Sequence, residues 1–126
     1  ENLNLENQFD VILNMEVIEH VKNIDLFLEN CSKLVKKNGI MFVATINKNL
    51  KSYLFAILGA EYVLRWLPIG THDWNKFLTP SELEIISKKY DFVKDSTVGM
   101  KFNLITQKWN QSTDESVNYI STFFKY

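Results

Sequence analysis

The sequence predicts an α/β fold built on a parallel sheet, and three consecutive segments carry this prediction. The run Phe9–Met15 has a continuous Val-Ile-Leu centre, which is typical of a strand buried on both faces of a parallel sheet. Apolar residues then recur at helical spacing over residues 24–35, and residues 40–45 form a second strand-like run. A strand, a helix and a second strand at this spacing indicate a right-handed crossover, the repeating unit of such sheets.

Local signals predict where the helices begin and end. Asn23 is expected to cap the first helix, and Asn38-Gly39 is expected to end it. Residues 79–82, with the sequence Thr-Pro-Ser-Glu, predict the start of another helix that ends near Tyr90. The threonine can cap this helix, the proline suits its first position, and the glutamate can complete a capping box.

The remaining segments are less regular. Residues 50–67 are mostly apolar and aromatic, but they carry too many charges for a membrane-spanning helix, so an amphipathic helix is expected. Two strand-like runs, residues 92–100 and 102–109, predict an antiparallel pair that closes the sheet. No element is predicted for residues 110–126.

The composition excludes several classes of protein. Fourteen Lys and Arg against fifteen Asp and Glu give a net charge of −1, which rules out a generally basic nucleic-acid binder. With 126 residues, 46% of them hydrophobic, the chain can build one core or part of a larger one. Cys31 is the single cysteine, so no internal disulfide is expected and a reducing, cytoplasmic setting is favoured.

Two carboxylates and an imidazole directly follow the first strand. In open α/β sheets, ligands bind at the carboxyl ends of the strands. If residues 16–21 form one helical turn, Glu16, Glu19 and His20 share a face and can hold a divalent metal or supply a general base. The alternative is two solvated glutamates and a histidine packed over the strand end.

Residues 9–21 resemble the fourth-strand motif of class I S-adenosylmethionine-dependent methyltransferases. Further segments narrow the resemblance, namely residues 34–39, 45–49, 59–65, 68–73, 76–83 and 117–119. Together they resemble the ubiquinone-biosynthesis O-methyltransferases, which methylate polyprenylated catechols such as demethylubiquinol.

This resemblance implies the carboxyl-terminal part of a Rossmann-like class I methyltransferase sheet. The family's glycine-rich loop and its ribose-binding acidic residue have no counterpart in the sequence. Residues 1–126 are therefore expected to be a partial methyltransferase domain that carries an amphipathic insertion at residues 50–67. The piece by itself is expected to be inactive.

The resemblance also assigns roles to residues. Met15 matches a position that contacts the cofactor near its adenine, with a plain core methionine as the alternative. Glu16, Glu19 and His20 match the family's magnesium ligands, and magnesium would hold the catechol oxygens and lower the pKa of the hydroxyl. An imidazole is an unusual ligand for so hard a cation, so His20, with Glu16, stays a catalytic candidate as a general base.

The insertion at residues 50–67 is associated in this family with the membrane surface. Lys48, Lys51 and Arg65 would then meet anionic head groups at the inner membrane, while apolar side chains dip in: Phe55, Ile57, Leu58 and Trp66. A helix that covers the sheet, or a lid over the active site, is the alternative. His72, Asp73 and Trp74 are candidates for the mouth of the substrate site, with an ordered loop as the alternative.

Several side chains are expected to serve packing alone: Cys31, Trp109, Phe123 and Phe124. A truncated sheet would expose an edge and apolar faces, so self-association is expected, or contact with other ubiquinone-biosynthesis proteins. Two further hypotheses remain. One is a related methyltransferase with another acceptor, and the other is an inactive split-gene remnant that acts as a membrane-surface or association module.

Overall fold

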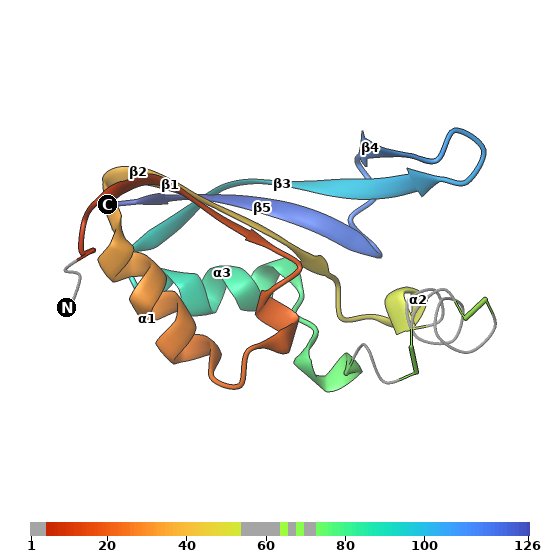
Figure 1. The fold of residues 1–126 in the computed structure, drawn as a ribbon, viewed down its shortest axis with the longest axis horizontal. Coiled ribbons are helices and arrows are strands. Elements are labelled where there is room, and N and C mark those ends of the chain that lie inside the picture. Colours follow the sequence, from red (N-terminus) through yellow and green to blue (C-terminus); the bar gives the residue numbers. More distant parts are fainter. Residues whose placement is uncertain (1–4, 54–63, 66–67, 70–72) are drawn as a thin grey trace.

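The sheet at the centre of the molecule has five strands in the order β1-β2-β5-β3-β4 (Figure 1). The structure, a computed structural model, describes residues 5–53, 64–65, 68–69 and 73–126. The strands are β1 (Phe9–Met15), β2 (Val35–Ile46), β3 (Phe92–Asn103), β4 (Lys108–Ser112) and β5 (Asn118–Lys125). β1 and β2 are parallel and the other neighbouring pairs are antiparallel, so the predicted α/β class and its parallel crossover are confirmed.

Two helices, α1 (Ile24–Leu34) and α3 (Pro80–Lys88), cover the same face of the sheet (Figure 1). The Asn23 side chain accepts a hydrogen bond from the Leu26 amide at 3.0 Å, which confirms the predicted cap of α1. At α3, Thr79 Oγ1 accepts from the Glu82 amide at 3.1 Å, and the Glu82 carboxylate accepts from the Thr79 amide at 2.8 Å. The predicted capping box is therefore present.

Three short helical turns complete the described elements: η1 (Ile18–His20), α2 (Leu50–Ser52) and η3 (Trp74–Lys76).

The predicted end of α1 at Asn38-Gly39 is wrong, because the helix stops at Leu34 and β2 starts at Val35. Val35 lies opposite Phe9 of β1, and Lys36 Nζ lies 2.8 Å from Asp10 Oδ1. Pairing with β1 therefore extends the strand backwards into residues that the local pattern assigns to a helix end.

The antiparallel pair predicted after α3 exists, but with other boundaries. β3 continues to Asn103, residues 104–107 form the turn, and β4 begins at Lys108. Trp109 is 55% exposed and its ring centre lies 5.3 Å from that of Phe102, so its packing is within the hairpin and not in the main core.

The tail, for which the sequence predicts no element, supplies a central strand. β5 lies between β2 and β3 and pairs with both. Alternate residues Tyr119, Ser121 and Phe123 are fully buried, whereas Phe124 is 41% exposed. The packing role expected for the two phenylalanines is thus confirmed for Phe123, whereas Phe124 lies outside the buried core.

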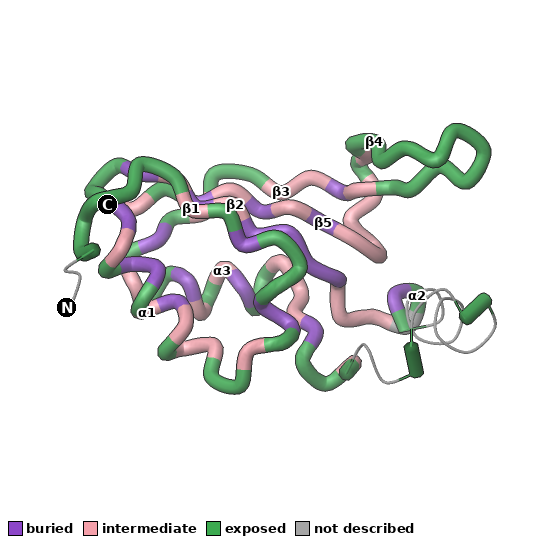
Figure 2. Tube along the Cα trace, in the orientation of Figure 1, coloured by how far each residue is buried: buried purple, intermediate pink, exposed green. Residues whose placement is uncertain are grey.

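The main core lies between the sheet and the two helices, where buried residues gather (Figure 2). Its buried members are Ile18, Leu28, Cys31, Val35, Met41, Val43, Leu83, Phe92, Tyr119 and Phe123. Cys31 is a free thiol in this cluster, as expected.

Burial of β1 on both faces is not observed. Leu13 is 64% exposed and Met15 is 50% exposed. Among the described strands, β1 pairs with β2 alone; Ile12 packs against the core, whereas Val11, like Leu13 and Met15, is exposed. The continuous apolar centre of β1 therefore lies at an open edge of the sheet.

The predicted amphipathic helix over residues 50–67 falls mostly outside the described residues. Its beginning is helical, since α2 spans Leu50–Ser52. Phe55, Ile57, Leu58 and Trp66 lie outside the described residues, and so does His72. Within the described ranges, no helix is long and apolar enough to cross a membrane.

Candidate functional site

The carboxyl ends of β1 and β2 lie side by side and form the candidate site. Met15 is opposite Ala44, and the Glu16 amide donates to the Ala44 carbonyl at 2.9 Å. Glu16 has a φ of 54°, a left-handed conformation that side-chain-bearing residues seldom adopt. The chain therefore turns sharply at the strand end, and such strained positions are frequent at functional sites.

Glu19 is a buried carboxylate with only one of its oxygens satisfied. The residue is 2% exposed, and its Oε2 accepts a hydrogen bond of 2.7 Å from Thr45 Oγ1 at the end of β2. Within the described part of the chain, Glu19 Oε1 has no hydrogen-bond partner. A buried oxygen of this kind is costly unless a proton or a cation compensates it.

Glu16 lies close enough to Glu19 to share that role. Although the residue as a whole is exposed, burial of its carboxyl, followed by the interaction with the neighbouring Glu19 carboxylate, raises the pKa of Glu16 to about 8. At neutral pH one of the two carboxyls therefore keeps a proton. A cation that binds the pair would replace this proton.

His20 lies at the rim of the site. Its side chain is 51% exposed, and its Nε2 is 4.0 Å from Glu19 Oε1. The expected single helical turn over residues 16–21 is wrong, because η1 includes only Ile18–His20 and Glu16 precedes it. The left-handed turn, and not helical spacing, brings Glu16 to Glu19. Among the described residues, no three His, Cys, Asp or Glu side chains gather as a metal cluster.

Tyr119 borders the site from β5. Its hydroxyl donates to the Leu78 carbonyl at 2.9 Å. Burial, followed by the negative charge of Glu19, holds the pKa of Tyr119 well above its usual range. The tyrosine therefore stays neutral beside the carboxylates.

The chain after β2 is fastened to the segment before β5. Asn47 Nδ2 donates to the Glu115 carbonyl at 2.9 Å, and Asn49 Nδ2 donates to the Ser116 carbonyl at 2.6 Å. No site role is predicted from sequence for Thr45, Asn47 or Asn49. The signal that could have identified them is the run of polar residues directly after an apolar strand.

Trp74, expected at the substrate mouth, packs in the same region. Its indole N–H donates to the Asn49 carbonyl at 3.3 Å, and Lys48 Nζ lies 5.2 Å from the ring centre. The Asp73 side chain caps η3 by accepting from the Asn75 amide. Asp73 and Trp74 thus belong to an ordered turn near the carboxyl ends of β1 and β2.

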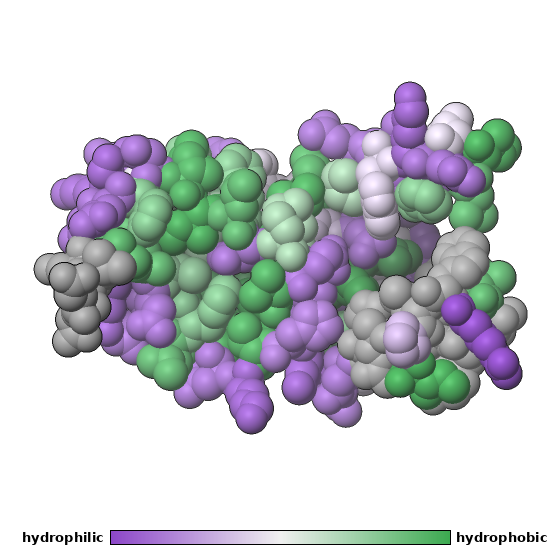
Figure 3. Space-filling model, viewed as in Figure 1, coloured by the Kyte–Doolittle hydropathy of each residue, from purple (hydrophilic) through white to green (hydrophobic). Residues whose placement is uncertain are grey.

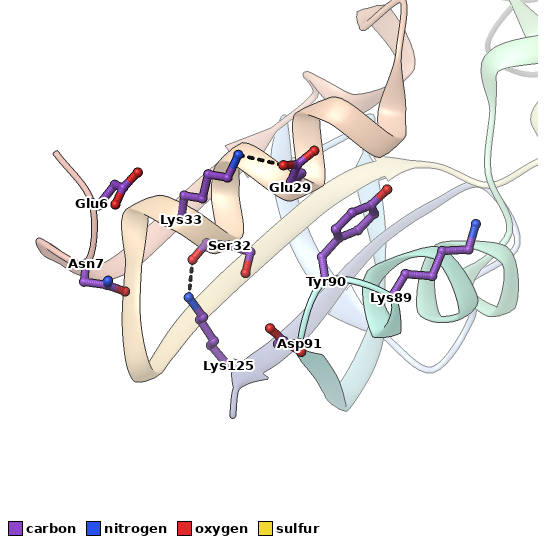
Figure 4. Close-up of a pocket in the computed structure, with 9 residues that line it drawn as sticks. All are labelled: Glu6, Asn7, Glu29, Ser32, Lys33, Lys89, Tyr90, Asp91 and Lys125. Carbon is purple, nitrogen blue, oxygen red and sulfur yellow. Dashed lines mark hydrogen bonds and ion pairs between the residues drawn. The ribbon is translucent and has the colours of Figure 1, made fainter. Parts of the chain in front are cut away.

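A pocket of about 350 Å³ lies at the opposite end of the strands, near the amino ends of β1 and β2 (Figure 4). Glu6 and Asn7 before β1, Ser32 and Lys33 at the end of α1, and Lys125 at the end of β5 line it together with four other residues. Its polar groups are engaged with one another, as in the 2.6 Å ion pair between Lys33 and Glu29 and the hydrogen bond from Lys125 to Ser32. Open α/β sheets bind ligands at the carboxyl ends of their parallel strands, and this pocket lies at the amino ends, so it is not the expected place of an active site.

The strand order and the polar groups at the ends of the parallel strands define the class, a Rossmann-like α/β fold. A solved S-adenosylmethionine-dependent methyltransferase from Thermotoga maritima shares it with a TM-score of 0.70, and the match covers all of this chain and 60% of that chain. At 15% identity this likeness shows the fold alone.

The sequence profile of the family described as "Methyltransferase domain" matches residues 1–97, and the chain belongs to this family. The ubiquinone biosynthesis O-methyltransferase of Pelagibacter ubique is 59% identical over 99% of this chain and 52% of its own length. The protein of the same name from Chelativorans sp. is 51% identical over 90% of this chain and 45% of its own length. The chain thus spans about half the length of the curated relatives it matches.

Proposed function

We propose that this chain forms the carboxyl-terminal part of an O-methyltransferase that acts in ubiquinone biosynthesis. The reaction would move a methyl group from S-adenosylmethionine to a hydroxyl of a polyprenylated catechol. The observation that carries the proposal is the 59% identity to a ubiquinone biosynthesis O-methyltransferase over 99% of the chain. The carboxylate pair at the strand ends gives this reaction a chemically suitable place.

Methyl transfer is a displacement in which the carbon–sulfur bond breaks as the new carbon–oxygen bond forms. Its catalysis depends on aligning the acceptor oxygen with the methyl group and on removing the hydroxyl proton. Met15, half exposed at the end of β1, would pack against the adenine of the cofactor. Glu16 and His20 are the candidate bases; Glu16, with a pKa of about 8, is a stronger base than an ordinary carboxylate but can accept the hydroxyl proton only after it has lost its own.

We further propose that the carboxylate pair binds a magnesium ion. The absence of a hydrogen bond to the buried Glu19 Oε1 among the described residues, and the raised pKa of Glu16, both favour a cation at this place, since carboxylate oxygens are the ligands magnesium prefers. Glu16 and Glu19 would hold it, with His20 as a third candidate ligand. When bound, the ion would stabilise negative charge on the catechol oxygens.

A chimaera tests the function directly. This chain would be joined to the amino-terminal half of the Pelagibacter ubique relative and supplied with labelled S-adenosylmethionine. Its acceptor would be either a demethylated polyprenyl catechol or a small catechol without the tail. We expect methylation of the polyprenylated acceptor and much slower reaction of the other. Equal rates would favour the second hypothesis, a methyltransferase for another acceptor.

The chain without its amino-terminal complement is expected to be inactive. Methylation of a polyprenyl catechol by these 126 residues alone would contradict this expectation. An inactive chain that still binds vesicles would fit a membrane-surface or association module.

Residues 50–67 are proposed to lie on the inner membrane, where a polyprenylated substrate would be found. Their mostly apolar composition supports this proposal. Lys51, one of the cations proposed to meet head groups, lies 3.0 Å from Asp114 Oδ2, so part of its charge is already balanced.

A further inference from the structure

The β3–β4 hairpin extends beyond the rest of the sheet and carries exposed apolar side chains at its end (Figure 1). Ile105 is 94% exposed, Leu104 is 67% exposed and Trp109 is 55% exposed. Exposing two neighbouring aliphatic side chains to water at the tip of a hairpin is unfavourable in free energy. Such exposure commonly marks a surface that another molecule covers.

The hairpin is amphipathic across its two faces. Phe102 lies opposite Trp109, with ring centres 5.3 Å apart, whereas Lys101 lies opposite Asn110 and Asn103 opposite Lys108. Because successive side chains of a strand point to opposite faces, the two aromatic rings share one face and the two lysines share the other. Figure 3 shows hydrophobic side chains at the outer end of this hairpin beside hydrophilic ones.

The tip is held in one conformation by its own hydrogen bonds. The Asn103 side chain accepts from the amides of Ile105 and Thr106 at 2.9 and 3.0 Å. Leu104 and Ile105 are therefore presented on a closed turn. Binding of a partner to these two residues therefore requires little additional loss of conformational entropy in the loop.

The charges of the hairpin have one sign. Residues 100–112 include two lysines, Lys101 and Lys108, and no acidic residue. Lys101 lies 3.2 Å from Asp114 Oδ2, whereas no acidic side chain among the described residues pairs with Lys108. An apolar tip, an exposed tryptophan and flanking lysines match the interface of a bilayer with anionic head groups.

We infer that the hairpin of residues 100–109 docks on an anionic lipid bilayer, with Leu104 and Ile105 entering the acyl boundary and Lys108 meeting the head groups. This inference goes beyond the proposed function and concerns a different segment from residues 50–67. β3 runs in the same direction as β1 and β2. The hairpin therefore projects from the end of the sheet at which β1 finishes and Glu16 lies (Figure 1). Docking would place the candidate site next to the membrane.

Cosedimentation of the full chain with vesicles of phosphatidylcholine and phosphatidylglycerol in a 3:1 ratio tests the inference. We expect the wild type to bind and the double variant Leu104→Ser/Ile105→Ser to bind about tenfold more weakly. The matched control is Ile85→Ser on α3, because Ile85 is 65% exposed but lies away from the hairpin. This control should bind like the wild type.

A charge variant gives a second measurement if the double variant folds poorly. Lys108→Glu should weaken binding several-fold, whereas Lys37→Glu, at the opposite end of the sheet, makes the same charge change and should weaken it less. Failure of the wild type to bind at low salt, or unchanged binding of both hairpin variants, would overturn the inference. Sedimentation that is equal with and without vesicles would also overturn it, because the chain would then pellet by self-association and not by binding lipid. None of these outcomes depends on methyl transfer, so the proposed activity keeps its own test. Failure of the wild type to bind would also count against the membrane position proposed for residues 50–67, whereas unchanged binding of the hairpin variants concerns the hairpin alone.

Discussion

The two faces of the sheet differ in what covers them. On one face, α1 and α3 bury a continuous core that includes Met41, Val43 and Phe123. On the other face, several apolar side chains are exposed, with Leu13 at 64% exposure and Phe124 at 41%. Leu13 lies opposite the half-buried Phe42 of β2, and Phe124 lies opposite the exposed Val93 of β3.

This contrast shows that strand composition and local cover are separate properties. The apolar pattern of β1 is that of a strand with both faces buried, and the described chain buries only one. The covered face should supply most of the stability of the chain. The open face and the β1 edge should govern its association with other molecules.

The largest expected effect separates two adjacent phenylalanines of β5. Phe123→Ala removes a fully buried ring and should lower the free energy of unfolding by about 3–5 kcal/mol. Phe124→Ala acts on the open face and should lower it by less than about 1 kcal/mol. Urea unfolding of the two variants measures the difference, and similar losses would show that the two faces are covered alike.

The open edge predicts a change in association. Leu13→Lys places a charge on the exposed side of β1, which should suppress edge-to-edge pairing. Sedimentation velocity should show concentration-dependent association for the wild type and a shift towards monomer for the variant. A wild-type chain that is a monodisperse monomer with a cooperative thermal transition would contradict this expectation.

A smaller effect concerns the pH dependence of stability near the carboxylate pair. The pKa of Glu16 is about 8 in the folded chain and near 4.5 in an unfolded one. As pH rises from 4.5 to 8, the unfolded chain loses this proton while the folded chain keeps it, so the free energy of unfolding falls across this window. Glu16→Gln should remove that part of the fall.

The slope due to Glu16 should stay below the one-proton limit of about 1.4 kcal/mol per pH unit, because solvent screens a partly exposed carboxyl. Urea unfolding at pH 5, 6.5 and 8 measures it, with Glu29→Gln on α1 as the control. Parallel curves for wild type and Glu16→Gln would mean that the two carboxyls of the site do not interact.

Local signals predicted one part of the fold and could not predict another. Asn23 and the run that begins at Thr79 mark helix starts because a cap depends on residues within one turn. β5 depends on pairing with β2 and β3, most of whose paired residues are distant in sequence, so its place between them could not be predicted from residues 110–126 alone. The predicted end of α1 was wrong for the same reason, since Val35 pairs with Phe9, which is distant in sequence.

The candidate site likewise has features that could be predicted from sequence and features that could not. That Glu16 and Glu19 lie at the end of a strand could be predicted from their position directly after an apolar run. The left-handed turn at Glu16 and the hydrogen bond from Thr45 to Glu19 are tertiary features. They bring Glu16 and Glu19 together and leave His20 at the rim, where helical spacing had predicted all three on one face. The metal and catalytic roles of Glu16, Glu19 and His20 stay predictions.

The most direct test of the central claim is the initial rate of the chimaera as magnesium is titrated, with a polyprenyl catechol as acceptor. We predict that Glu19→Gln and Glu16→Ala raise the magnesium concentration needed for half-maximal rate about tenfold or more. Glu29→Gln, remote from the site, should leave it unchanged. Rates of the two site variants that equal the wild type at limiting magnesium would contradict the claim that these carboxylates form the working site.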